Sequence, residues 1–271
     1  MSQLNWGTKI YLGVLYNKMT NTFNLFSLDF IVLICIASMV SGVIKGVVGF
    51  GMPMIFITFM TMYVDPALAL GILILPTLTT NAWQACRQGT SAAILALYEH
   101  RWFLGITSVC LLITTQMVPL LSQTLFFICL GLFVIGLATL MLIGWRPWRR
   151  NSIGLSIFCA LVAGVGGGLS GVWGPPTVVY LSKDSLKKEA QVRAQGVIYG
   201  LCSIFLFLGH VQSGIATAPV LALGLCAIMP AFFGQWIGFK IQDSINQVLF
   251  SKITLCILLV AGLNLIRRGL L

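Results

Sequence analysis

Apolar residues run continuously along most of this chain, and only short polar breaks interrupt them. Eight apolar segments stand out, with approximate bounds Phe30–Val48, Pro66–Trp83, Trp102–Leu121, Leu125–Trp145, Ile153–Val172, Ala194–Val211, Ile215–Phe239 and Val248–Ile266. Each is about as long as a helix that crosses roughly 30 Å of hydrocarbon. The longest polar break, Ser182–Arg193, leaves no room for a soluble domain. The pattern therefore predicts an all-α, polytopic membrane protein that forms one membrane domain.

Composition supports this class of protein. Hydrophobic residues make up 58% of the 271 positions, and the mean hydropathy is +0.99. Only 8% of residues are charged, against about 25% in soluble domains. A soluble or disordered chain is therefore excluded. Residues 1–27 contain only a short apolar stretch, Ile10–Tyr16, so we expect an N-terminal extension at the membrane interface, without a cleavable signal peptide.

The chain contains an internal duplication. Gly42-x3-Gly46-x2-Gly49-x3-Pro53 has the same spacing as Gly164-x3-Gly168-x2-Gly171-x3-Pro175. Weaker matches follow in the same order, so we expect two repeats of four segments, residues 28–150 and 151–271. Inverted repeats with re-entrant segments one and five would place more Lys and Arg side chains on the cytoplasmic side than eight simple crossings would. The sequence therefore favours inverted repeats.

The two glycine and proline motifs have two interpretations. Small residues four positions apart allow helices to pack closely. That reading leaves the prolines unexplained, because proline lacks an N–H and interrupts a helix. We therefore favour broken helices that restart at Met54–Met62 and Thr177–Leu181. Matching breaks in two repeats indicate a transporter's substrate site, and the restarting helix ends would favour an anion.

The distribution of charge also favours an anionic ligand. The net charge is +10, which reflects either the usual cytoplasmic excess of Lys and Arg or an anionic substrate. All six acidic residues lie at segment ends or in loops, as expected if the ligand is not a cation. Lys45 lies inside the first motif, and either faces a cavity or extends to the membrane surface. No basic module typical of nucleic-acid binding is present.

These arguments give a set of candidate residues. The candidate substrate-binding residues are Lys45, Gly46, Gly49, Gly51, Pro53, Asn81, Gln84, Gly168, Gly171, Trp173, Gly174, Pro175 and Arg193. Four apolar neighbours are expected to enclose a short carbon tail: Phe50, Met52, Trp173 and Tyr180. The eight cysteines show no metal-binding spacing, and no set of catalytic groups is apparent. We therefore expect no metal, no cofactor and no enzymatic activity.

The duplicated motif, with Gly-Pro-Pro after the second copy at Gly174–Pro176, resembles the TauE/SafE family of sulfite exporters over about residues 28–268. The resemblance implies a permease for sulfur oxyanions, such as sulfite or organosulfonates, in the bacterial cytoplasmic membrane. Its expected partners are a small anionic substrate and the lipid bilayer, with a homo-oligomer left open and no nucleic acid. A passive anion channel and a non-transporting assembly factor remain alternatives.

Overall fold

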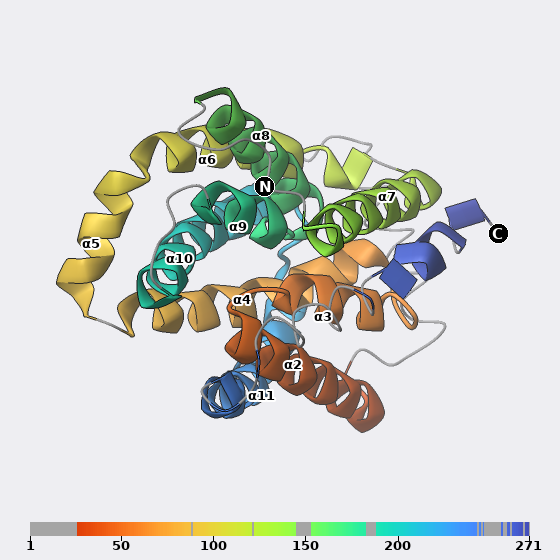
Figure 1. Cartoon of the computed structure of the whole chain (residues 1–271). Helices are drawn as coiled ribbons and strands as arrows, with labels where there is room; N and C mark the ends of the chain where they lie inside the picture. The colour runs from red at the N-terminus through yellow and green to blue at the C-terminus, as the bar shows by residue number, and fades with distance from the viewer. Residues whose placement is uncertain are drawn as a thin grey trace.

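A computed structural model describes residues 26–87, 89–120, 122–144, 153–182 and 188–242, together with scattered residues between 244 and 270. The described helices are α2 (Leu28–Val48), α3 (Met52–Met60), α4 (Pro66–Cys86), α5 (Thr90–Glu99), α6 (Arg101–Thr115), η1 (Val118–Leu120), α7 (Gln123–Leu142), α8 (Ile153–Ser170), α9 (Gly174–Ser182), α10 (Lys188–Gln212) and α11 (Ala218–Gln242) (Figure 1). Most of the proposed N-terminal extension and of the eighth apolar segment lies outside the described residues.

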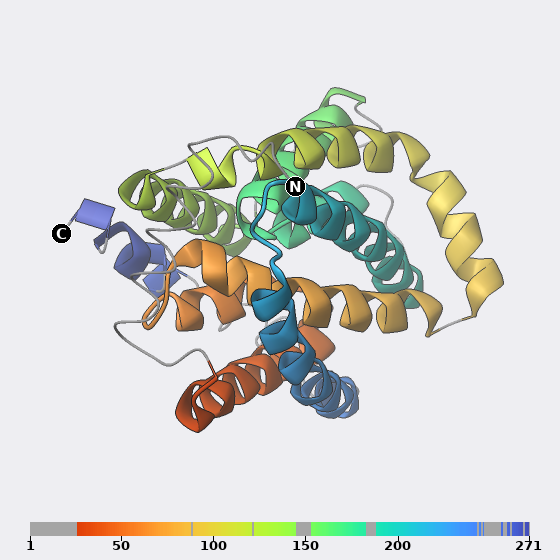
Figure 2. The ribbon, with the colours of Figure 1, turned by 180° about the vertical axis from the view of Figure 1, so that it is seen from behind.

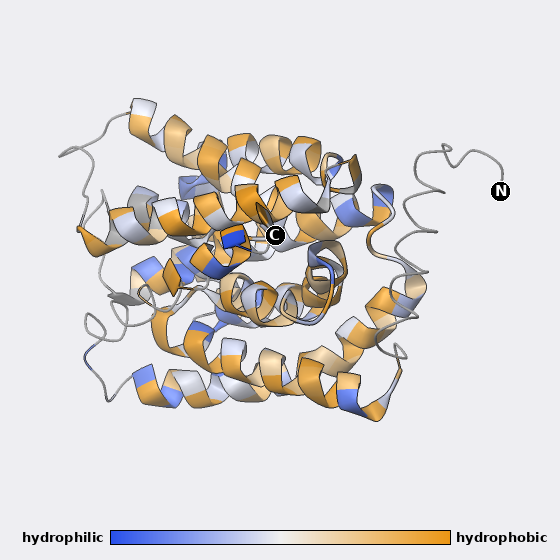
Figure 3. Cartoon of the chain, turned by 90° about the vertical axis from the view of Figure 1, so that its right-hand side faces the viewer, coloured by the Kyte–Doolittle hydropathy of each residue, from blue (hydrophilic) through white to orange (hydrophobic). Residues whose placement is uncertain are grey.

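The described part of the chain is helical and contains no strand. Five helices are long and apolar enough to cross a membrane: α2, α4, α8, α11 and the Ala190–Gln212 part of α10. Large apolar side chains, including Leu28, Trp102 and Met229, are exposed on the outside of the molecule. Apolar residues run along most of the helices in Figure 3. The expected all-α, multi-pass membrane architecture is therefore confirmed.

The third apolar segment differs from the expectation. A continuous helix over Trp102–Leu121 was expected, but α6 ends at Thr115 and a short 3-10 helix follows at Val118–Leu120. Pro119 accounts for this end, because it has no N–H to donate to the carbonyl of Thr115. The short helix α5, which no apolar segment indicated, comes before α6.

Helices α2 and α11 pack through glycines on both partners. A Cβ on Gly42 would collide with the backbone oxygen of Ala231, and one on Gly46 would meet the backbone of Gly238. Gly234 and Gly238 are equally tight against the backbone of α2. The close-packing interpretation is thus correct for Gly42 and Gly46, since only hydrogen fits between these two backbones.

Helix α4 runs between two groups of helices (Figures 1 and 2). On one side are α2, α3 and α11. On the other are α6, α8, α9 and α10, with α5 joining α4 to α6 along the outside. The two broken helices therefore approach each other from opposite sides of α4. Whether the halves are inverted repeats with re-entrant segments stays a prediction.

Candidate functional site

The first motif breaks its helix at the predicted place. Helix α2 ends at Val48, and Gly49 caps it with φ 82° and an N–H that donates to the carbonyl of Lys45 at 2.7 Å. Gly51 has φ 94°, a backbone conformation that residues other than glycine rarely adopt. Helix α3 then begins at Met52, two residues before the predicted restart. The prediction placed Pro53 before the helix, but proline fits the first turn, where its missing N–H needs no partner.

The second motif repeats this arrangement. Helix α8 ends at Ser170, and Gly171 follows with φ 69° and an N–H that donates to the carbonyl of Gly167 at 2.7 Å. Helix α9 begins at Gly174, so the predicted restart at Thr177 is three residues late. The reason is again that prolines are compatible with a first helical turn. Each motif thus joins a long helix to one of nine residues.

The two breaks lie against each other. A Cβ placed on Gly171 would be 3.5 Å from the Cβ of Pro53, which is ordinary van der Waals contact. A Cβ placed on Gly174 would be 3.1 Å from the Cβ of Phe50. The starts of α3 and α9 consequently face one common space, although the motifs are far apart in the sequence.

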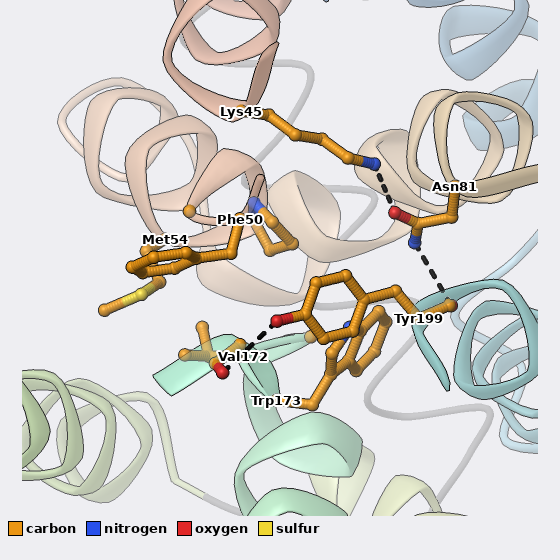
Figure 4. Close-up of a pocket in the computed structure, with 11 residues that line it drawn as sticks. Lys45, Phe50, Met54, Asn81, Val172, Trp173 and Tyr199 are labelled. Atoms are coloured by element: carbon orange, nitrogen blue, oxygen red, sulfur yellow. Dashed lines mark hydrogen bonds between the residues drawn. The ribbon is translucent and has the colours of Figure 1, made fainter. Parts of the chain in front are cut away.

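A cavity lies between the two breaks (Figure 4). The space between its atoms, counted together with the open space at its mouth, is about 280 Å³. Its lining residues are Lys45, Phe50, Gly51, Pro53, Met54, Asn81, Gly171, Val172, Trp173, Gly174 and Tyr199. The first break, α4, the second break and α10 each contribute, so the cavity lies at the boundary between the two groups of helices.

Lys45 is the one basic side chain among the described residues that line this cavity. Its side chain is only 2% exposed, so it does not extend to the surface. Its Nζ donates to the Oγ1 of Thr80 at 2.8 Å and to the Oδ1 of Asn81. The Nδ2 of Asn81 in turn donates to the carbonyl of Tyr199 at 3.1 Å and to the Oγ of Ser203 at 2.6 Å. Asn81 therefore connects Lys45 to α10.

The backbone supplies fewer donors than the sequence suggested. In the first turn of α3, Met52 and Met54 carry N–H groups and Pro53 does not. In the first turn of α9, Pro175 and Pro176 follow Gly174, so only Gly174 has an N–H. The positive ends of both helix dipoles still face the cavity. The first turn therefore offers two N–H groups at the first break and one at the second.

Five candidate residues are absent from the described lining of the cavity: Gly46, Gly49, Gln84, Gly168 and Arg193. Gly46 packs against α11, and Gly168 packs against Thr114 on α6. Gln84 lies behind the first break, where its Nε2 donates to the carbonyl of Gly49 at 3.2 Å. Arg193 lies on α10 outside the lining residues. The side chain of Pro175 lies outside the described residues.

The apolar wall differs in part from the expectation. Phe50 and Trp173 line the cavity, as do Met54 and Val172. Met52 and Tyr180, which were expected there, lie elsewhere. Met52 is buried beside Thr80, 3.6 Å from its hydroxyl oxygen. The Tyr180 ring stacks on Phe103 with 4.0 Å between centroids, and its hydroxyl is 3.0 Å from the Nδ1 of His100.

Tyr199 lines the cavity but is not among the residues predicted from the sequence. An aromatic residue within an apolar helix is typical of a core position, so it gave no signal of its own. Its hydroxyl donates to the carbonyl of Gly174 at 3.3 Å and so holds the second break.

Comparison with known proteins identifies one family. The chain matches the family model described as "Sulfite exporter TauE/SafE" over residues 34–265, which is most of its length. No curated protein and no solved structure matches the chain.

Proposed function

Because the chain belongs to the sulfite exporter TauE/SafE family, which is a family of membrane transporters, we propose that it carries a small sulfur oxyanion across the membrane. The ligand site in this proposal is the cavity between the two helix breaks. The membrane is the bacterial cytoplasmic membrane.

The observation that carries the proposal is the environment of Lys45. In the part of the chain that the structure describes, no carboxylate lies within 4.0 Å of its Nζ, and its two partners, Thr80 and Asn81, are neutral. A buried ammonium without a counter-charge is strongly unfavourable. A bound anion supplies the missing charge, and Lys45 already lines the cavity that would hold it.

The remaining lining suits a sulfonate or sulfite. The oxygens of such an anion can accept from Lys45 and from the N–H groups of Met54 and Gly174, and both helix dipoles favour negative charge there. Phe50, Trp173 and other apolar side chains would enclose a short carbon tail.

The position of the cavity supports alternating access. It lies at the boundary between the α2–α3–α11 group and the α8–α9–α10 group, and Tyr199 is close to the middle of α10. Relative movement of the two groups around the breaks would open the cavity to one side of the membrane at a time. Gly49, Gly51 and Gly171 provide the backbone freedom for this movement.

Ligand binding by the purified protein tests the proposal. Sulfite, ethanesulfonate, acetate and phosphate are compared for their effect on thermal stability, and the affinity of the best ligand is measured by calorimetry. Lys45→Met should weaken binding of sulfite or ethanesulfonate ten- to hundredfold, as expected for a hydrogen bond to a charged group worth about 1.5–3 kcal/mol.

Lys240→Met is the matched control, since the Nζ of Lys240 lies over the Trp236 ring, 3.7 Å from its centroid, and outside the cavity. This variant should bind within about twofold of the unmodified protein. Equal affinities for Lys45→Met and Lys240→Met would contradict the proposed site. Stronger stabilisation by metal cations than by any oxyanion would contradict the substrate class.

A further inference from the structure

The hydrogen bonds of Lys45 are compatible with both protonation states of its amine. Thr80 donates its own hydroxyl to the carbonyl of Pro76 at 2.6 Å, so its oxygen accepts from Lys45. The Oδ1 of Asn81 also accepts, because an amide oxygen has no proton. A neutral amine has two N–H donors, and an ammonium has three. Both forms satisfy the two acceptors, and only the third position on Nζ changes.

The acidic residues of α2 and α4, the helices that carry Lys45, Thr80 and Asn81, are remote from Lys45. Asp29 is in the first turn of α2 and Asp65 caps the start of α4. Each is sixteen residues from Lys45 or Asn81 along its own helix, which corresponds to about 24 Å. Neither carboxylate can neutralise an ammonium in the cavity.

The other titratable groups around Lys45 offer no negative charge. Helix α3 contains none. Helix α2 also carries Cys35, and α11 carries Cys226 and Lys240. Helix α4 ends with Cys86 and then Arg87, whose guanidinium lies over the ring of Phe239. The titratable side chains of α10 that the structure describes are Arg193, Tyr199, Cys202 and His210. Of these four, only Tyr199 lines the cavity, and its hydroxyl is directed to Gly174.

From this geometry we propose that Lys45 binds one proton together with each anion, so that the chain carries a monovalent sulfonate and a proton in the same step. The inference rests on the proposed function. In the empty cavity Nζ is a neutral amine with its lone pair in the third position. A proton from water binds that lone pair when the anion enters, and the new N–H donates to an anion oxygen. When the anion leaves, the proton returns to water.

The coupling follows from the cost of charge in a buried site. An ammonium alone or an anion alone would each be uncompensated there, whereas the pair is neutral. The two species therefore bind cooperatively, and a monovalent anion crosses without moving net charge. A gradient of protons can then drive the anion, or a gradient of the anion can move protons.

Calorimetry with ethanesulfonate measures this coupling directly. Alkanesulfonates stay anionic throughout the pH range in which proteins are folded, so any proton taken up on binding goes to the protein. The apparent binding enthalpy is measured in buffers of different ionisation enthalpy. The slope of the binding enthalpy against the buffer's ionisation enthalpy gives the number of protons taken up per anion bound. We expect about one proton per ethanesulfonate, with an affinity that falls about tenfold per pH unit where the amine is neutral.

Lys45→Arg is the informative variant, because arginine keeps its proton. We expect it to bind ethanesulfonate without proton uptake and with little pH dependence, whereas Lys240→Met should keep the proton uptake of the unmodified protein. If Lys45→Arg does not fold, the proton count of the unmodified protein decides alone. Binding without proton uptake would overturn the coupling and leave the proposed function standing. No binding of ethanesulfonate or sulfite would overturn both.

Discussion

Replacement of Asn81 by aspartate would give Lys45 a permanent counter-charge. The side chain keeps its shape, and one carboxylate oxygen takes the position of the amide oxygen that accepts from Nζ. The other oxygen replaces the Nδ2 group, so the two hydrogen bonds that Nδ2 donates to Tyr199 and Ser203 are lost, as they are in Asn81→Ala. The third position on Nζ still faces the cavity, but an anion there now meets an adjacent negative charge. We therefore expect Asn81→Asp to fold and to bind sulfonates poorly.

The size of the effect follows from the geometry. Two groups bonded to the same ammonium have charge centres about 6 Å apart, and like charges at that distance repel by about 3 kcal/mol at an effective dielectric constant of about 20. This corresponds to about a hundredfold loss of affinity. Asn81→Ala removes the hydrogen bonds to Lys45, Tyr199 and Ser203 without adding charge. Such bonds average about 0.6 kcal/mol, so its stability should fall by about 2 kcal/mol and its affinity by less than tenfold.

The assay is calorimetric binding of ethanesulfonate to both variants, with thermal unfolding followed in parallel. Asn81→Asp should also bind without proton uptake, because its Lys45 stays charged. If Asn81→Asp binds ethanesulfonate within about threefold of the unmodified protein, the electrostatic reasoning is refuted. If Asn81→Ala loses as much affinity as Asn81→Asp, hydrogen-bond geometry rather than charge controls the site.

Three other perturbations test the fold around the site. Gly171→Ala and Gly144→Ala should both lower the free energy of unfolding by about 1–2 kcal/mol, since both glycines have φ 69°. Only Gly171→Ala should weaken ethanesulfonate binding, because Gly171 lines the cavity. Equal affinities of the two variants would contradict the placement of Gly171 at the site. Gly46→Leu should abolish the monodisperse peak in size-exclusion chromatography, because its side chain would meet the backbone of α11, and an unchanged peak would refute that packing. Reporter fusions at Asp65 and Lys187 should report opposite sides of the membrane for inverted, re-entrant repeats, and the same side for eight simple crossings.

The positions of the helix breaks were predictable because glycine and proline act on the backbone locally. The spacing of Gly49, Gly51 and Pro53 located the first break, and its copy located the second. The starts of α3 and α9 were less predictable, since a proline is compatible with positions before and within the first turn. The packing of Gly42 and Gly46 against α11 depends on a helix about 190 residues later, which local pattern does not indicate.

The cavity was predictable only where a residue was chemically unusual in its segment. Lys45 and Asn81 are polar residues within apolar runs, and both line it. Tyr199 lines it because α10 packs against α4, and its identity is ordinary for an apolar helix. Gly168 matched the motif as well as Gly171 did, yet it packs on α6, because it lies within α8 whereas Gly171 lies beyond the end of α8 in the break.

Counterflow in proteoliposomes tests whether the protein carries ethanesulfonate through the cavity at Lys45. Vesicles loaded with unlabelled ethanesulfonate are diluted into a trace of labelled ethanesulfonate, and a carrier then accumulates the label transiently. If Lys45 binds the transported anion, the label should accumulate with the unmodified protein and with Lys240→Met, but not with Lys45→Met. Equal accumulation with Lys45→Met and the unmodified protein would contradict the role of Lys45 in anion transport. Label entry without transient accumulation would indicate a passive channel.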